Sequence, residues 1–185
     1  MKNILTFLLL FISTLGFSQS IINPDTVCIN TMGSTYEVTN IVGATFTWTV
    51  QAPGILVSGQ NTNAIVVDWS LAPAGIIPNG ISVTIAGQAC PVTPVNLNVF
   101  IYQPVANITA LGPFCSGDAC ANLVASPIGG TFTGSGVAGS TFCPTTSGAG
   151  IIPVTYSVID RGCPVTTTIN ITVNPSFIVG PIQHD

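Results

Sequence analysis

The residues that could do chemistry in this chain are few and far apart. Of its 185 residues, six are aspartate or glutamate, two are lysine or arginine and one is histidine. The histidine, His184, lies next to the end of the sequence, where no shell of residues would hold it as a general base. The carboxylates are scattered singly, with no pair spaced for acid–base work: Asp25, Glu37, Asp68, Asp118, Asp160 and Asp185. We therefore expect no catalytic residues, no cofactor and no enzymatic activity.

Metal binding has one candidate, Asp118, which follows Ser116 and Gly117. Single aspartates in the loops of β-sandwich domains bind calcium through oxygen ligands. The alternative, an aspartate that caps its own turn, is favoured. Zinc is disfavoured because Cys115 and Cys120 form the one close pair of cysteines and no Cys-x-x-Cys occurs. We expect no bound metal.

The cysteines and the first residues together predict a secreted protein. Residues 1–20 begin with a positively charged segment at Lys2 and continue with an apolar run and small residues before Gln19, as in a cleaved signal peptide. The apolar run is too short for a transmembrane helix and lacks a basic flank, so we expect a chain that does not span a membrane. Six cysteines behind such a segment predict disulfides in an oxidising compartment.

The composition limits the class of partner. Arg161 is the single lysine or arginine after Lys2, and charged residues make up 4% of the chain. With so few cations the protein cannot neutralise a phosphate backbone, which excludes nucleic acid as a partner. A surface so poor in charge also lacks the repulsion that keeps copies apart, which favours self-association or a partner protein.

The secondary structure of the chain is predicted to be mainly β-strand. Thr45–Val50 alternates threonine with Phe46, Trp48 and Val50, and Ile65, Val67 and Trp69 alternate in the same way. Such alternation between turn signals is typical of a β-sandwich. We interpret Trp48 as a core residue beside a disulfide; the alternative is a platform on which a sugar ring stacks. Helix is expected to be nearly absent.

An internal repeat divides the chain into two modules. The sequence Ala-Gly-Ile-Ile-Pro occurs at residues 74–78 and again at 149–153, and Cys-Pro-Val-Thr at 90–93 and 163–166. A strand closes each copy, at 95–99 and at 169–173. This duplication predicts two tandem sandwiches: a signal peptide 1–20, a first sandwich 21–101, a short linker 102–104, a second sandwich 105–174 and a tail 175–185. The proline-stiffened linker predicts a semi-rigid rod.

The repeat also predicts the disulfides. Cys28 and Cys90 are the cysteines of the first module, so we expect them to pair. By analogy Cys115 pairs with Cys163, which leaves Cys120 with Cys143 across glycine-rich loops. We expect loss of Cys115–Cys163 to unfold its module, because modules of this size have small cores. Loss of Cys120–Cys143 should be tolerated, because that disulfide spans only loops.

The residues resemble a known group of proteins. The segments at 43–48, 58–60 and 66–69, between Cys28 and Cys90, look like PKD-like modules of secreted surface proteins in the Bacteroidetes. The segments at 114–118, 129–132 and 134–137 look like the Ig-like repeats that accompany them. The resemblance implies type IX secretion and a role in adhesion or gliding motility. Cys120 and Cys143 depart from the pattern, and the given sequence holds no large C-terminal sorting domain.

Two further sites follow from the sequence. Asp25-Thr26-Val27 resembles the Asp-Thr-aliphatic sequon for O-glycosylation in the Bacteroidetes, which makes Thr26 a candidate; ordinary turn-then-strand chemistry is the alternative. In the tail, the apolar side chains lie between Pro175 and Pro181: Phe177, Ile178 and Val179, followed by Ile182. The tail either folds back on the second module or is captured by a partner as an added strand.

The sequence thus predicts an all-β, non-enzymatic, secreted cell-surface protein built from two Ig-like (PKD-like) sandwiches. We expect a role in adhesion, gliding motility or a surface or outer-membrane assembly linked to type IX secretion. An outer-membrane or cell-surface protein is the expected partner, docked through the tail. The alternative function is that of a carbohydrate-binding module.

Overall fold

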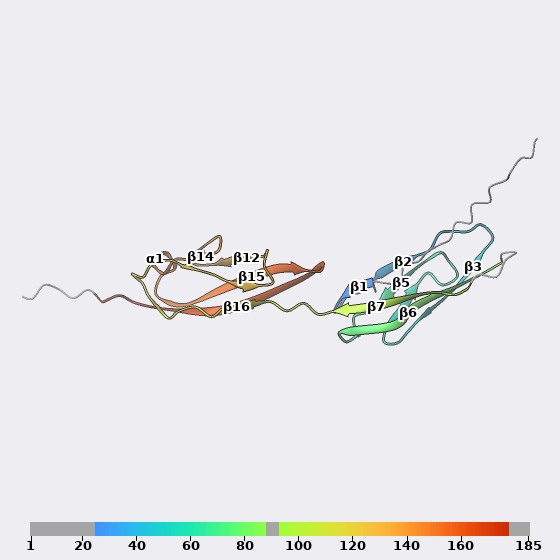
Figure 1. The fold of residues 1–185 in the computed structure, drawn as a ribbon, viewed down its shortest axis with the longest axis horizontal. Coiled ribbons are helices and arrows are strands. Elements are labelled where there is room, and N and C mark those ends of the chain that lie inside the picture. Colours follow the sequence, from blue (N-terminus) through green and yellow to red (C-terminus); the bar gives the residue numbers. More distant parts are fainter. Residues whose placement is uncertain (1–24, 88–92, 178–185) are drawn as a thin grey trace, which may run out of the picture.

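The computed structural model describes residues 25–87 and 93–177. Two groups of β-sheets lie end to end and give the molecule the shape of a rod (Figure 1). The predicted signal peptide lies outside the described residues, as do Cys90, Ile178, Val179, Ile182 and His184. No hydrogen-bonded sheet within the described ranges mixes strands from the two groups.

The first module is a sandwich of a four-stranded and a three-stranded sheet. The larger sheet has the order β1-β7-β6-β3, with β1 (Asp25–Cys28), β7 (Val95–Tyr102), β6 (Gly75–Ala86) and β3 (Thr45–Val50). The smaller has the order β2-β5-β4, with β2 (Ser34–Glu37), β5 (Ala64–Asp68) and β4 (Ile55–Ser58). β1 runs parallel to β7, whereas the other pairs in this module are antiparallel.

The alternating strands supply the core of this module, as predicted. In β3, Phe46 and Trp48 are 3% and 5% exposed, while the threonines between them face solvent. On the opposite sheet, Ile65 and Val67 of β5 are fully buried, and so is Trp69, which directly follows β5. The Trp69 indole N–H donates a hydrogen bond to the Tyr36 hydroxyl at 3.0 Å, so the polar atoms of both buried side chains are paired.

The second module is organised on a long antiparallel hairpin. Its four-stranded sheet has the order β12-β15-β16-β9, with β12 (Thr131–Gly134), β15 (Gly150–Asp160), β16 (Cys163–Asn174) and β9 (Phe114–Cys115). Shorter strands complete it: β8 (Asn107–Ile108), β10 (Ala121–Asn122), β11 (Ala125–Ser126), β13 (Val137–Ala138) and β14 (Thr141–Phe142). A single turn of helix, α1, spans Pro144–Ser147. Phe142, Val154 and Ile171 form the centre of the core and are fully buried.

The internal repeat corresponds to one recurring arrangement of strands. The β6–β7 hairpin matches the β15–β16 hairpin, and each is joined on its edge by a parallel strand, β1 or β9. The repeated Ala-Gly-Ile-Ile-Pro opens the first strand of each hairpin, because β6 begins at Gly75 and β15 at Gly150. In β6 the register shifts between Ile77 and Ile81, where the Asn98 side chain accepts a hydrogen bond from the Asn79 N–H.

Candidate functional site

A disulfide joins the two modules to each other. Cys28 pairs with Cys163, with the two Cα atoms 5.5 Å apart and 135 residues between them in sequence. The predicted pairs Cys28–Cys90 and Cys115–Cys163 are therefore wrong. The disulfide also lies at the junction of the modules, so the prediction that Trp48 packs beside it is wrong as well.

The strands bring these two cysteines together at the middle of the rod. β1 ends at Cys28, which lies opposite Tyr102, the last residue of β7. β16 begins at Cys163, which lies opposite Asp160 across the tight turn of the second hairpin. The end of the first module thus meets a turn of the second (Figure 1). The prediction failed because it assumed that each module closes its own disulfide.

Polar contacts surround this disulfide. The Tyr102 hydroxyl donates a hydrogen bond to the Asp160 carboxylate, which joins β7 to the β15–β16 turn. The guanidinium carbon of Arg161 lies 5.0 Å from the centroid of the Tyr102 ring, a cation–π distance. Arg161 has a φ of 50° and Gly162 a φ of 83°, the left-handed geometry of a two-residue hairpin turn. The turn therefore presents a carboxylate, a cation and a cysteine to the first module.

The hydrogen bond to Asp160 favours the neutral, protonated form of Tyr102. It raises the pKa of Tyr102 above its usual value, and partial burial and the negative charge of Asp160 act in the same direction, while Arg161 opposes them. The neutral hydroxyl is the donor, so the contact is present below the usual tyrosine pKa of about 10. It is lost as the pH rises through the raised pKa of Tyr102.

Replacing Asp160 by asparagine tests this contact. We expect Asp160→Asn to lower the pKa of Tyr102 toward its usual value, because the negative charge that disfavours the phenolate is gone. Spectrophotometric titration of the tyrosines measures this directly. Tyr102→Phe, which removes the group, identifies its step in the titration curve. An unchanged curve in Asp160→Asn would show that the two side chains do not meet.

A groove of about 540 Å³ lies beside the inter-module disulfide. Three segments line it: the end of β1 with Ile29 to Thr31, the linker residues Gln103 and Pro104, and the start of β16 with Pro164 to Thr166. None of these lining residues carries an ionisable side chain, since both cysteines are in the disulfide. The groove therefore offers amide and hydroxyl groups for contact and supplies no general acid or base.

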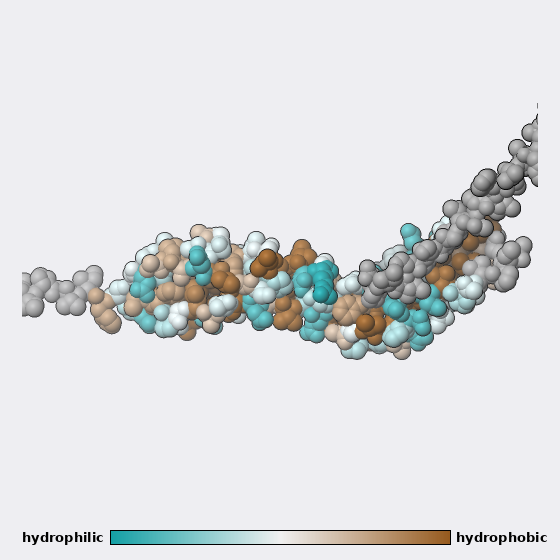
Figure 2. Space-filling view, in the orientation of Figure 1, coloured by the Kyte–Doolittle hydropathy of each residue, from teal (hydrophilic) through white to brown (hydrophobic). Residues whose placement is uncertain are grey.

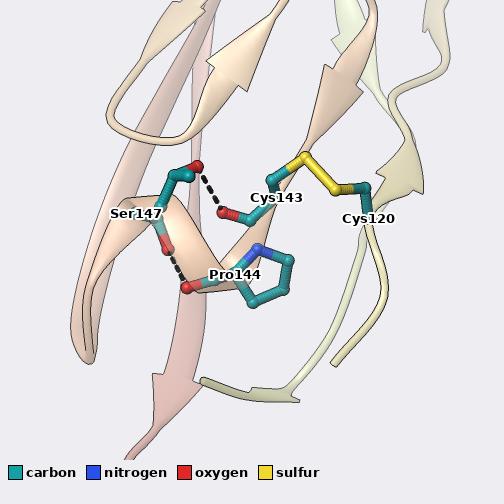
Figure 3. The surroundings of a disulfide bond; sticks show 5 residues. Cys120, Cys143, Pro144 and Ser147 are labelled. Atoms are coloured by element: carbon teal, nitrogen blue, oxygen red, sulfur yellow. Dashed lines mark hydrogen bonds between the residues drawn. A yellow bond between two sulfur atoms is a disulfide. The ribbon is translucent and has the colours of Figure 1, made fainter. Parts of the chain in front are cut away.

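A second disulfide, Cys120–Cys143, agrees with the prediction. The Cα atoms are 4.1 Å apart, and Cys143 stands immediately before α1 (Figure 3). The Cys143 carbonyl accepts hydrogen bonds from the N–H groups of Thr146 and Ser147, both at 3.1 Å. The Cys143 N–H in turn donates to the carbonyl of Gly136 at 2.8 Å. The disulfide thus holds α1 and the glycine-rich loop to the edge of the second module.

Removing this second disulfide should weaken its module without unfolding it. The bond closes a segment of 23 residues, and chain entropy for such a loop gives about 3 kcal/mol. The β15–β16 hairpin, which supplies Val154 and Ile171 to the core, lies outside that segment. We expect Cys120→Ser with Cys143→Ser to lower the melting temperature of the second module while its near-ultraviolet circular dichroism is kept. Complete loss of that signal at 25 °C would contradict this.

The structure places the remaining candidates apart from one another. The Thr26 side chain is exposed on edge strand β1, where a modifying enzyme can reach it. The Asp118 carboxylate accepts a hydrogen bond from the Cys115 N–H at 2.7 Å, so it caps its own turn. Trp48 belongs to the core and donates from its indole to the Thr62 carbonyl. No cluster of three or more potential metal-binding side chains occurs among the described residues.

The first described residues of the tail continue away from β16. The Ser176 N–H donates to the Ser116 hydroxyl at 2.9 Å, which ties the start of the tail to the turn after β9. The next side chain, Phe177, is 91% exposed. Other exposed apolar side chains are scattered along the rod in separate patches (Figure 2). Phe177 therefore does not pack on the second module.

The structure adds residues that the sequence analysis did not name as a site: Tyr102, Asp160 and Arg161. Their signal in the sequence is slight. Asp160-Arg161-Gly162 reads as an ordinary hairpin turn, and Tyr102 as the end of a strand. The one unusual feature was that Arg161 is the single lysine or arginine after Lys2.

The comparison with known families agrees with the fold. Residues 16–96 match the family model described as PKD-like domain. This match covers most of the first module and ends near the start of β7, so that part of the all-β chain is similar to a PKD-like domain. No curated protein matches the chain. A disulfide-bonded PKD-like domain suggests an extracellular or secreted protein with an adhesion-related role.

No helix within residues 25–87 and 93–177 is long and apolar enough to cross a membrane.

Proposed function

We propose that this protein is a non-enzymatic, secreted surface protein that acts as a rigid spacer in adhesion, gliding motility or an outer-membrane assembly. The observation that carries the proposal is the junction. A spacer must hold its two ends at a fixed separation, and a single flexible linker does not do that. The disulfide Cys28–Cys163 supplies a second covalent connection beside the linker, and the contacts of Tyr102 supply a third attachment.

The surface chemistry supports a spacer and not a catalyst. The Asp118 carboxylate accepts a hydrogen bond from the Cys115 N–H, and the Asp160 carboxylate accepts one from the Tyr102 hydroxyl, so both stabilise the fold. Trp48 and Trp69, the two tryptophans of the chain, lie in the core, so neither can stack on a sugar. The carbohydrate-binding alternative therefore has no tryptophan platform to support it.

The tail supplies the proposed attachment to a partner. Phe177 is exposed, and apolar residues follow it in the sequence: Ile178, Val179 and Ile182. An extended segment of this kind can add as a strand to an exposed sheet edge of a partner protein. Pro175 and Pro181 restrict that pairing to a short register, because proline donates no ladder hydrogen bond. The resemblance to proteins of type IX secretion supports an outer-membrane or cell-surface partner.

Surface display in the native host tests the proposal. Antibody binding to intact cells should detect the wild-type protein, and deletion of residues 176–185 should release it from the surface. Phe177→Ser with Ile178→Ser and Val179→Ser should have the same effect at unchanged length. Thr133→Ser, on an exposed strand of the second module, is the matched control and should change nothing. If the truncated chain is displayed like the wild type, the tail does not dock the protein.

A further inference from the structure

β3 is an edge strand that lacks the usual protection against pairing with another chain. It forms one edge of the larger sheet of the first module, and within the described residues it pairs with β6 alone. Its sequence, Thr-Phe-Thr-Trp-Thr-Val, has high β-propensity and contains no charge, proline or glycine. Segments of this length and composition pair readily with strands of other chains. Natural proteins protect such edges with lysine, proline or a bulge, and β3 has none of these.

Alternate residues of β3 direct their backbone groups toward the free edge. Successive residues of a strand point their N–H and C=O groups to opposite sides. The Gln51 N–H, one residue beyond β3, donates to the Gly80 carbonyl of β6 at 2.8 Å. The odd-numbered residues of β3 therefore point to β6. The even-numbered residues point away from it: Phe46, Trp48 and Val50.

The side chain of Gln60 covers the middle of this free edge. Its carboxamide oxygen accepts a hydrogen bond from the Trp48 N–H at 2.9 Å, and its carboxamide nitrogen donates to the Trp48 carbonyl at 3.0 Å. A residue of an added antiparallel strand would exchange the same two hydrogen bonds with Trp48. The carboxamide therefore occupies the place at which a partner strand would pair.

The connection from β4 to β5 holds Gln60 in this position. Gly59 has a φ of 94°, and a Cβ there would collide with the Ala64 carbonyl oxygen, so the turn requires glycine. The Thr62 hydroxyl lies within hydrogen-bond distance of the carbonyls of Gly59 and Ala64, at 2.8 and 2.6 Å. The Trp48 indole N–H donates to the Thr62 carbonyl at 2.8 Å. The turn is thus fixed both to itself and to the strand that it covers.

We propose that Gln60 is a cap that keeps the edge of β3 from pairing, and that the edge beneath it fits β3 of a second copy of this chain. The strand is self-complementary. In a two-fold antiparallel pair, Trp48 lies opposite Trp48 of the second copy, and the outward-pointing residues on both sides of it pair as well. Thr47 then lies opposite Thr49 of the second copy, on the exposed face of the joined sheets. The charge-poor surface supplies little repulsion against this pairing.

This inference goes beyond the proposed spacer function and involves neither the junction nor the tail. It explains how a charge-poor sandwich with an unprotected edge strand stays separate from its copies. The device differs from a contact that only ties the two sheets of the sandwich together. Loss of such a tie would lower stability, whereas loss of an edge cap also creates a specific contact between folded copies.

Analytical ultracentrifugation of the purified mature chain tests the proposal. Gln60→Ala should associate into a dimer at least about ten-fold more tightly than the wild type, because the two backbone groups of Trp48 become free to pair. Near-ultraviolet circular dichroism confirms that the variant is folded. Gln51→Ala replaces an exposed glutamine next to the same strand and is the matched control. It should sediment like the wild type.

Paired charges identify the surface of the dimer. In the Gln60→Ala background, Thr47→Lys with Thr49→Lys places like charges opposite each other across the proposed pair and should abolish the added association. Thr47→Glu with Thr49→Glu should do the same. An equal mixture of the lysine and glutamate variants should form a heterodimer, because each lysine then faces a glutamate.

Amide hydrogen exchange distinguishes edge pairing from a loss of packing. In the Gln60→Ala dimer, the N–H groups of Phe46 and Val50 should exchange at least about ten-fold more slowly than in the wild type, because they enter a new ladder. Gln60→Asn is the second variant in case Gln60→Ala does not fold. Its carboxamide is one methylene shorter and draws back from Trp48, so it should show the same changes.

Three results would each overturn the proposal. The first is a folded Gln60 variant that associates no more tightly than the wild type. The second is a dimer that persists when lysines replace both Thr47 and Thr49, or a charge-swapped mixture that stays monomeric. The third is a dimer in which the exchange of Phe46 and Val50 is unchanged, because its contact would then lie elsewhere on the surface.

Discussion

Replacing Cys28 and Cys163 together by serine is expected to give the largest change in the shape and stability of this protein. In the wild type, the first module is attached to the second at two points: the disulfide at Cys28 and the linker after Tyr102. When the first module unfolds and the second stays folded, the chain between these two points therefore remains a closed loop. Chain entropy for a loop of that length gives about 4–5 kcal/mol. The variant loses this contribution, and the melting temperature of the first module should fall by about 20 °C or more.

The same variant should change the shape of the molecule in solution. One short linker then connects the modules, and they sample a range of angles, so small-angle X-ray scattering should show a broader distribution of maximum dimension. Cys115→Ser is the control, because that side chain is exposed and bonded to no described residue. It should leave both the scattering of the monomer and its melting temperature unchanged. A double variant that behaves like the wild type would refute the role assigned to the junction.

Replacing Trp69 by alanine is expected to unfold the first module alone. Trp69 is fully buried, and removal of such a side chain costs about 3–5 kcal/mol. The change also leaves the buried Tyr36 hydroxyl without its indole donor. Domains of this kind have total stabilities of about 5–15 kcal/mol, and a small module is expected at the lower end of that range, where the two losses together remove most or all of the stability. The core of the second module is separate and should persist.

Tryptophan fluorescence measures this effect without interference. The chain has two tryptophans, both in the first module, so Trp48 reports on that module once Trp69 is gone. Trp69→Ala should shift the emission of Trp48 to that of an exposed indole. Trp69→Phe keeps most of the packing and should lose only about 1–3 kcal/mol. Native emission from Trp48 in the alanine variant would show that Trp69 is not central to the core.

The core strands were predictable because their side chains alternate. In β3 and β5 the buried positions are the apolar ones, and the hydrophobic pattern alone decides which face turns inward. β4 was missed, because Ile55–Ser58 lies between turn residues and is an edge strand whose register shifts near Val57. Its side chains are largely exposed and leave no alternating pattern to read.

The junction was not predictable, because it depends on how two separate folding units meet. Composition and spacing indicated disulfides, and the repeat indicated equivalent cysteines, but neither states whether equivalent cysteines pair within a module or between modules. Cys120–Cys143 was predicted only as the pair left over after the other two assignments, and it is correct although both of those assignments are wrong. Cys28–Cys163 joins residues 135 positions apart and depends on the direction in which β7 leaves the first module.

Disulfide mapping is the most direct measurement of the central claim, the covalent junction. Pepsin digestion at low pH suppresses thiol–disulfide exchange, because thiols stay protonated, and mass spectrometry then identifies linked peptides before and after reduction. We expect a peptide that contains Cys28 joined to one that contains Cys163, and a second linked pair from Cys120 and Cys143. Cys28 joined to Cys90, with Cys163 joined to Cys115, would mean that each module closes its own disulfide and would contradict the account.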